Sequence, residues 1–191
     1  TSTRAVDRLA SLGLRVLALE PATLGQTRRV IERVALALGD EAAGPALWQA
    51  LNARVDAAAA RVPAARRGQR VYVEVASTPF AAGEASFIGE LLARLGLANI
   101  VPATMGPFPQ LSPEFVLRAQ PDVVMAAAAP LAGMAQRPGW RQLRALQSGA
   151  QCGFAPAAYD ALVRAGPRMA EAADALVDCL VGLGDRGSRA P

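Results

Sequence analysis

The spacing of hydrophobic residues in the first third of the chain predicts two helices. Residues 24–38 carry apolar side chains at helical intervals, and Gly39 follows them as a residue that commonly ends helices. Residues 41–61 form a longer, alanine-rich helix that Pro63 stops. Its apolar stripe consists of Leu47, Trp48, Leu51 and Val55.

Residues 4–19, which precede both helices, show a mixed pattern. They predict the end of a helix, a stop at Gly13 and then a short strand over Arg15–Leu19.

Beyond the second helix the pattern switches to short, mostly apolar runs that are typical of buried strands. These runs are Arg70–Ala76, Asn99–Val101, Asp122–Ala126 and Ala150–Phe154. Helices are predicted over 87–96 with a cap at Ser86, over 113–119, near Leu143–Leu146, and over about 168–182 after Pro167. Strands that alternate with helices indicate an α/β fold with a largely parallel sheet.

The run 106–114 combines a stiff loop with the start of a helix. Prolines on both sides fix the backbone around Phe108, so its ring has little freedom. Ser112 is a natural N-cap, and Glu114 falls one residue before the position that a capping box uses. Two interpretations of Glu114 stay open: a surface acid that favours the helix dipole, or a residue that faces a partner.

The composition narrows the class of protein. The chain has 191 residues, of which 52% are hydrophobic, enough for one good core or two small lobes. All 20 basic residues are arginine, the net charge is +4, and the sequence contains neither lysine nor histidine. The arginines are scattered and only 5% of residues are aromatic, so the basic balance does not favour nucleic-acid binding.

The sequence does not directly identify the cellular compartment of the protein. No window approaches the length of apolar residues that a membrane span needs, and no charged-then-apolar leader precedes Thr1. A processed or trimmed N-terminus would account for this start. Cys152 and Cys179 lack metal-ligand spacing, and either a disulfide or two buried thiols fits them.

The sequence gives little support for an enzymatic function. Without histidine there is no Ser-His or Cys-His pair, and without lysine there is no Walker lysine or Schiff base. The segment Gly182–Gly187 matches GxGxxG, but it follows a helix near the chain end, where no βα unit can follow. We interpret it as a flexible terminus and the chain as a binding protein.

Ligands of parallel sheets bind at the carboxyl ends of the strands. Three loops reach that edge: Ser77–Ala85, Ala103–Leu111 and Pro156–Gly166. The candidate ligand-binding residues on them are Phe80, Phe108, Tyr159, Asp160 and Arg164. Such a set suits a large, flat, partly apolar ligand with amide or carboxylate groups. The alternative is that the two phenylalanines anchor their loops and that Asp160 and Arg164 form a solvated pair.

Several stretches together resemble a known family. They are DRLASLGLRVLAL (7–19), the helix at 41–61, TPFAAGEASFIGELLARLGLANI (78–100), FPQLSPEFVLRAQPDVVMA (108–126), RPGWRQLRAL (137–146) and AGPR (165–168). The chain, from near Arg4 to about Leu180, resembles the ABC-transporter substrate-binding proteins whose two lobes are joined by one long rigid helix. These proteins serve vitamin B12, haem and ferric-siderophore uptake.

The resemblance implies roles for particular residues. The vitamin B12-binding members are most similar, and in them Phe80 and Phe108 would line a corrin pocket, while Asp160 and Arg164 would contact corrin side chains. Glu114 would dock on an arginine of the membrane permease. The resemblance further implies a periplasmic protein that binds a transported ligand, in the first place cobalamin. It implies no resident cofactor or metal.

The resemblance also implies a division into domains. Residues 1–39 would be the remnant of an N-terminal lobe, 40–66 the linking helix, 67–185 a Rossmann-like C-terminal lobe and 186–191 a flexible tail. The strands and the docking glutamate that normally precede Arg4 do not occur in this sequence. A cysteine pair typical of the B12 binders is not expected.

Three other functions stay open. Haem binding would use Tyr159 as an axial oxygen ligand, and Tyr72 is the only other tyrosine. A ferric siderophore would pair an anionic chelate with Arg164. An interaction module would dock on a membrane partner through the surface around Glu114 and carry no ligand.

Overall fold

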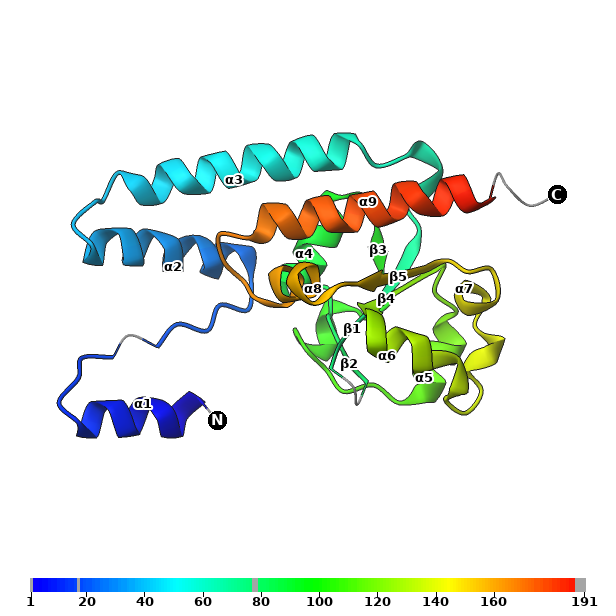
Figure 1. Cartoon of the computed structure of the whole chain (residues 1–191), viewed down its shortest axis with the longest axis horizontal. Helices are drawn as coiled ribbons and strands as arrows, with labels where there is room; N and C mark the ends of the chain where they lie inside the picture. The colour runs from blue at the N-terminus through cyan, green and yellow to red at the C-terminus, as the bar shows by residue number, and fades with distance from the viewer. Residues whose placement is uncertain (1, 17, 77–78, 188–191) are drawn as a thin grey trace.

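The computed structural model describes residues 2–16, 18–76 and 79–187. Helix α1 (Ser2–Ser11) stands apart at the N-terminal end, and an extended segment joins it to α2 (Leu24–Ala37) (Figure 1). Helix α2 forms an antiparallel hairpin with the long helix α3 (Ala43–Ala60), which agrees with the two helices predicted at 24–38 and 41–61. The rest of the chain forms an α/β lobe.

The strand predicted over Arg15–Leu19 is wrong for the residues that the structure describes. Residues 15, 16, 18 and 19 belong to no strand, and Leu17 lies outside the described residues. A strand needs a neighbour for its backbone hydrogen bonds, and all described strand pairings involve residues beyond 69. The apolar pattern of this segment is therefore not sufficient to predict a strand.

The sheet is organised around β1 (Arg70–Ala76). One edge of β1 pairs in parallel with β4 (Val123–Ala127), which pairs in parallel with β5 (Gln151–Phe154). The other edge is shared: β3 (Ala98–Asn99) pairs in parallel with the start of β1, and β2 (Phe80–Ala81) pairs antiparallel with its end. The predicted α/β class with a largely parallel sheet is confirmed, with β2 as an antiparallel addition.

Helices cover both faces of the sheet because side chains of β1 and β4 alternate between two cores. Val71, Val73, Val123 and Met125 join the core under α4 (Phe87–Arg94), α8 (Pro156–Val163), α9 (Met169–Gly187) and α3. Tyr72, Val124 and Ala126 join the core under α5 (Pro113–Ala119), α6 (Ala128–Gly133) and α7 (Arg144–Gln147). Short 3-10 turns lie at Ala64–Arg66, Ala103–Met105, Met134–Gln136 and Trp140–Gln142.

Local signals account for the helices whose bounds the sequence predicted well. Ser86 accepts a hydrogen bond from the Gly89 amide at the start of α4, and Ser112 accepts one from the Phe115 amide at the start of α5. Helix α5 ends where Gln120 adopts a left-handed conformation at φ 44°.

Two predictions near the C-terminus need correction. The segment Pro156–Gly166 was expected to be a loop, but its first eight residues form α8, with Pro156 at the first helical turn. The GxGxxG segment Gly182–Gly187 was expected to be a flexible terminus, but α9 runs through it. The sheet, α8 and α3 all pack against α9, and this tertiary packing outweighs the poor helix propensity of glycine. Residues 188–191 of the predicted tail lie outside the described residues.

A disulfide joins the sheet to the last helix. Cys152 on β5 and Cys179 on α9 are bonded, with their Cα atoms 5.8 Å apart. Of the two states that the sequence left open, the structure therefore contains the disulfide. Ion pairs extend the attachment of α9 to α3, because Arg54 pairs with Asp174 and Arg61 pairs with both Asp174 and Asp178.

We predict that this disulfide contributes measurably to stability. The bond closes a loop between residues 27 apart, which corresponds to about 3–4 kcal/mol of loop-closure entropy in the unfolded chain. Urea unfolding with and without a reducing agent measures this loss. The double variant Cys152→Ala/Cys179→Ala is the control, since its midpoint should lie near that of the reduced protein and ignore the reductant. A wild-type midpoint that does not respond to reductant would contradict the prediction.

Candidate functional site

The carboxyl ends of β1 and β4 separate and leave a hollow between them. Pairing between the two strands ends at Val73 and Met125, whereas β4 stays paired with β5 as far as Ala127. A hollow of about 300 Å³ opens beyond that point, and we call it the fork hollow. Its lining consists of Glu74, Val75, Ala76, Ala126, Ala127, Pro130 and Tyr159. This edge is where the sequence predicted a ligand.

Tyr159 lies on α8 and reaches the fork hollow from the side of the sheet that α8 covers. Its hydroxyl donates a 3.2 Å hydrogen bond to the main-chain carbonyl of Glu74. The hydroxyl thus supplies a partner for a strand carbonyl at the position where pairing with β4 has ended. The structure therefore places one predicted site residue, Tyr159, in the hollow itself.

The Glu74 side chain is almost completely buried, with 1% of it exposed, and it is held by three donors. The two terminal nitrogens of the Arg137 guanidinium lie 2.5 and 2.8 Å from the two carboxylate oxygens. The Tyr72 hydroxyl donates to the same carboxylate at 2.9 Å. These contacts satisfy a charge that would otherwise be very costly to bury.

Aromatic rings complete the surroundings of Arg137. Its guanidinium lies 4.6 Å from the centre of the Trp140 ring, a distance typical of a cation–π contact. Trp140 is fully buried and meets the Tyr72 ring edge to face, with centres 5.8 Å apart. Arg137 is therefore clamped between a carboxylate and an aromatic face.

This environment changes the ionisation of both tyrosines. Burial first, and then the charge of Glu74, raise the pKa of Tyr159 above its ordinary value of 10.0, and the same causes raise the pKa of Tyr72 further. Both phenols are thus held neutral in the folded protein. Because unfolded tyrosine ionises near pH 10, the stability they contribute is fully present below that pH and is lost as the pH rises above it.

The two predicted aromatic residues lie on adjacent loops but have different surroundings. Phe80 sits on β2 and is 36% exposed. Phe108 is half-buried, and its ring meets that of Phe87 at 6.0 Å between centres. The loops are joined by the bridge between Phe80 and Gln110. Phe108 therefore packs against the core, whereas Phe80 is partly exposed, and the ligand contact predicted for both residues stays a prediction.

Asp160 and Arg164 form the predicted pair because α8 is helical at this point. They make an ion pair one helical turn apart, and Arg168 joins Asp160 at 3.4 Å and Glu171 at 2.9 Å. Asp160, Arg164 and Arg168 border a smaller hollow of about 160 Å³ beside Pro167. The cluster contains two arginines and two acids, so its charges balance.

Glu114 occupies the first turn of α5 and is exposed. No hydrogen bond or ion pair of its side chain occurs within the described part of the chain, although Arg118 lies one turn further on. Both interpretations that the sequence left open remain compatible with this position.

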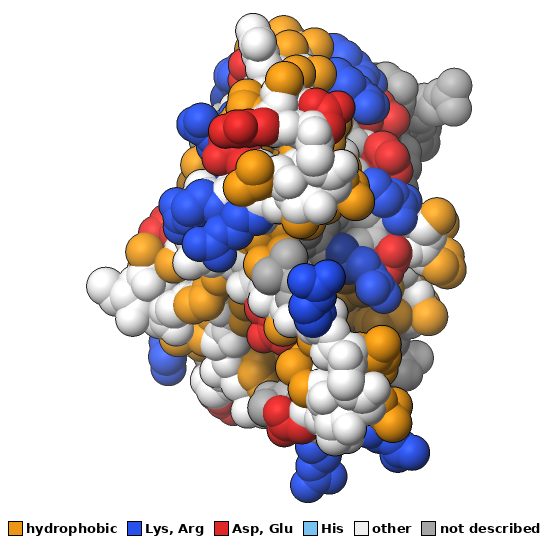
Figure 2. Space-filling model, turned by 90° about the vertical axis from the view of Figure 1, so that its left-hand side faces the viewer, with side chains coloured by type: hydrophobic (Ala, Val, Ile, Leu, Met, Phe, Trp, Pro, Cys, Tyr) orange, Lys and Arg blue, Asp and Glu red, His pale blue; other side chains and the backbone are white. Residues whose placement is uncertain are grey.

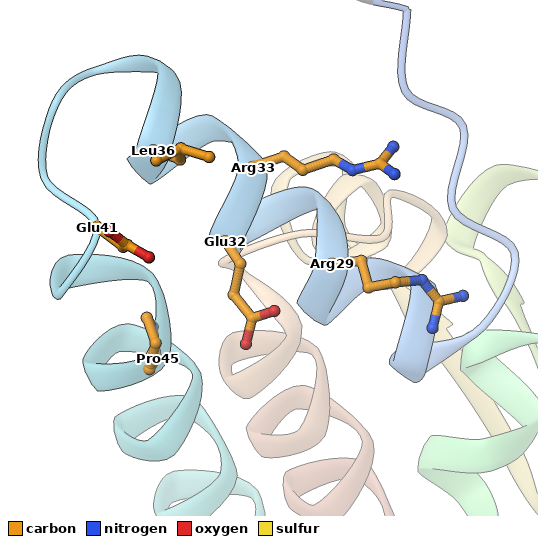
Figure 3. A pocket seen from close by; sticks show the side chains of 6 residues that line it. All are labelled: Arg29, Glu32, Arg33, Leu36, Glu41 and Pro45. Carbon is orange, nitrogen blue, oxygen red and sulfur yellow. The ribbon is translucent and has the colours of Figure 1, made fainter.

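Two other hollows lie on the α2–α3 hairpin, away from the sheet edge. One, of about 570 Å³, is lined mainly by apolar residues of both helices and includes Val34, Leu38 and Leu47, with Leu38 as much as 80% exposed. The other, of about 400 Å³, is bordered by charged residues of both signs; Figure 3 shows Arg29 and Arg33 on the same side of α2, with Glu32 reaching toward α3. Figure 2 shows this end of the molecule, where arginine and acidic side chains are interspersed with hydrophobic ones.

The chain is similar in sequence and in fold to known periplasmic binding proteins. The sequence model of a family described as periplasmic binding protein matches residues 2–150. A search of curated proteins finds no match. Among solved structures, a possible iron-binding (periplasmic solute-binding) protein from Staphylococcus epidermidis superposes with a TM-score of 0.76 and 20% identity, over 93% of this chain and 70% of that one.

Two further solved structures are similar. The periplasmic vitamin B12-binding protein BtuF of Vibrio cholerae has a TM-score of 0.67 and 22% identity, over 95% of this chain and 71% of that one. The periplasmic haem-binding protein BhuT, solved with two haems, has a TM-score of 0.70 and 26% identity, over 94% of this chain and 71% of that one.

The described residues show no features of a membrane-spanning helix or of a metal cluster. No helix in the described ranges is both long and apolar enough to cross a membrane. The same ranges hold no group of three or more residues able to ligate a metal ion.

We predict that Arg137→Ala lowers the free energy of unfolding by about 3–5 kcal/mol, because it leaves the Glu74 charge buried without its main partner. Urea unfolding measures the loss. Arg118→Ala is the matched control, since Arg118 is exposed and its removal should change stability by no more than about 0.5 kcal/mol. Similar losses in the two variants would contradict the prediction.

Proposed function

The chain belongs to the periplasmic binding protein family, and from this we propose that it binds a corrinoid such as cobalamin and delivers it to the permease of an ABC importer. The family consists of binding proteins, which are transport components rather than enzymes. A periplasmic location accompanies the proposal. The observation that carries it is the fork hollow with Tyr159 at its edge, together with the charge-balanced cluster that Asp160, the next residue on α8, forms with Arg164, Arg168 and Glu171.

The balance of charges in this cluster favours a neutral ligand. Asp160 and Arg164 are already paired with each other, and Arg168 is shared between two acids. A ligand rich in amides can accept from the arginines and donate to the acids without leaving a charge unpaired. A ligand with carboxylates would instead compete with Asp160 and Glu171 for the same two cations.

Exposed aromatic and apolar surface beside the fork hollow supports a flat ligand. Phe80 is the accessible ring on this edge, and Val75, Ala76 and Ala127 line the hollow with small apolar groups. The hollow of about 300 Å³ is at the lower end of the range for ligand pockets, so most of a ligand as large as a corrinoid would lie over the edge of the sheet.

Haem is the second candidate, and the similarity to BhuT at 26% identity favours it. An axial tyrosine binds iron as its phenolate. In this chain the Tyr159 hydroxyl is engaged with the Glu74 carbonyl, and burial raises its pKa. Both features favour the neutral phenol, and for this reason we place the corrinoid first. A ferric siderophore meeting Arg164 and a ligand-free docking module come after these two.

Spectroscopic titration of the folded chain with cyanocobalamin, haemin and a ferric siderophore tests the proposal. We expect saturable binding of cyanocobalamin, weakened about tenfold in Phe80→Ala by loss of aromatic contact. Val181→Ala, which also removes an exposed apolar side chain but on α9, should bind as the wild type does.

Other outcomes of the titration decide against the corrinoid. Binding of haemin with a spectrum that changes in Tyr159→Phe would replace cobalamin by haem. No binding of any of the three by a chain with a folded circular dichroism spectrum would contradict a carrier function for this chain.

The second part of the proposal concerns the permease. We expect Glu114→Arg to leave cyanocobalamin binding unchanged and to reduce permease-dependent uptake by at least about tenfold. The reason is that the new arginine would face the arginine that we expect on the permease, and the two charges would repel each other. Glu41→Arg, a charge reversal on the distant α2–α3 hairpin, is the control. Uptake by Glu114→Arg equal to that of the control would remove Glu114 from the docking surface.

A further inference from the structure

The fork hollow lies where contacts from the two faces of the sheet converge on one residue. Arg137 approaches Glu74 from the face covered by α5, α6 and α7, where Tyr72 and Trp140 are buried. Tyr159 approaches it from the opposite face, where it packs against the core under α8 and α9. The first group holds the side chain of Glu74, and the second binds its main-chain carbonyl.

The side-chain contacts leave Glu74 little freedom. Both carboxylate oxygens are bound to the guanidinium of Arg137, one of them also to Tyr72, and the guanidinium itself rests on Trp140. A two-point contact of this kind fixes direction as well as distance. The strand is therefore immobilised at the first residue beyond its pairing with β4.

Stability alone does not account for an ion pair at this place. Apolar side chains of similar volume often stabilise a core as well as a buried ion pair does. What an apolar pair lacks is a directed contact. Here the direction matters, because the register between β1 and β2 is irregular between Glu74 and Ala76, so the strand ladder does not fix this segment by itself.

We propose that Arg137 and Glu74 form a positioning pair for the ligand site. By fixing the end of β1, the pair presents the Glu74 carbonyl to the Tyr159 hydroxyl and so sets where Tyr159 stands in the fork hollow. Neither charged group contacts the ligand. The link to ligand binding rests on the function proposed above, whereas the effect on Tyr159 does not depend on it.

The small number of tyrosines makes the effect on Tyr159 directly measurable. The chain has two tyrosines, so Tyr72→Phe leaves Tyr159 as the sole phenol, and its ionisation is read from phenolate absorbance. Two changes in this background keep both charges and alter one partner. Arg137→Lys removes the two-point contact, and Glu74→Asp draws the carboxylate back from the guanidinium by one methylene group.

If the pair positions Tyr159, both variants should lower the Tyr159 pKa toward its ordinary value of 10.0, because the hydroxyl loses its carbonyl partner and gains access to water. Arg118→Lys, an exposed change on α5, should leave it unchanged. Each titration is compared with circular dichroism over the same pH range, so that only folded protein is read.

The same variants in the otherwise wild-type chain are then titrated with cyanocobalamin, with an expected loss of affinity of about tenfold. Arg137→Lys should weaken binding much less when Tyr159→Phe is already present, because both changes act through one hydroxyl.

An unchanged Tyr159 pKa in the two folded variants overturns the positioning pair, whether or not cyanocobalamin binds. Failure of both variants to fold assigns the pair to core stability and overturns it as well. A lowered pKa together with no cyanocobalamin binding, even by the parent, keeps the positioning pair and removes the proposed function.

Discussion

The buried carboxylate of Glu74 is the group on which the end of the lobe that carries the candidate site depends. With 1% of its side chain exposed, it requires a cation and further donors in order to remain charged. Arg137 supplies the cation from a segment 63 residues further along the chain. Arg137 lies between the turns at Met134–Gln136 and Trp140–Gln142, so its contact with Glu74 attaches this segment to the end of β1. Glu74 is also the first residue of β1 beyond the pairing with β4, so the buried ion pair and the edge of the fork hollow meet at this residue.

The sequence predicted the elements that carry their own local signals. The bounds of β1 and α5 agree with the structure, because an apolar run defines the first and the Ser112 cap with Pro113 defines the second. Predictions were wrong where contacts between residues far apart in the sequence determine the local structure. Arg15–Leu19 had the pattern of a strand, but no described strand pairing involves its described residues, and the segment Pro156–Gly166 was predicted to be a loop although its first eight residues form α8. Packing against β5 and α3 carries α9 through its glycines.

The candidate site was predictable in part for the same reason. Tyr159, Asp160 and Arg164 follow the last strand, and topology brings whatever follows a parallel strand to the ligand edge. Glu74 and Arg137 were missed. The available signal was one acid inside an apolar strand run, which implies a buried charge and therefore a partner. Nothing in the sequence spacing identifies that partner, since the pairing depends on the folded turn that holds Arg137 against Trp140.

The proposed preference for a neutral ligand follows from how little charge the site leaves unpaired. Glu74 is neutralised by Arg137, and the cluster on α8 and α9 balances two arginines against two acids. An anionic ligand would have to displace an acid from its arginine, so its gain from the new ion pair would be offset by the loss of an existing one. A neutral, amide-bearing ligand avoids that exchange, because hydrogen bonds to a charged pair can be added without breaking it. Selectivity in such a site would then come from the pairs that the protein has already formed, and the positioning of Tyr159 would decide whether the ligand can reach them.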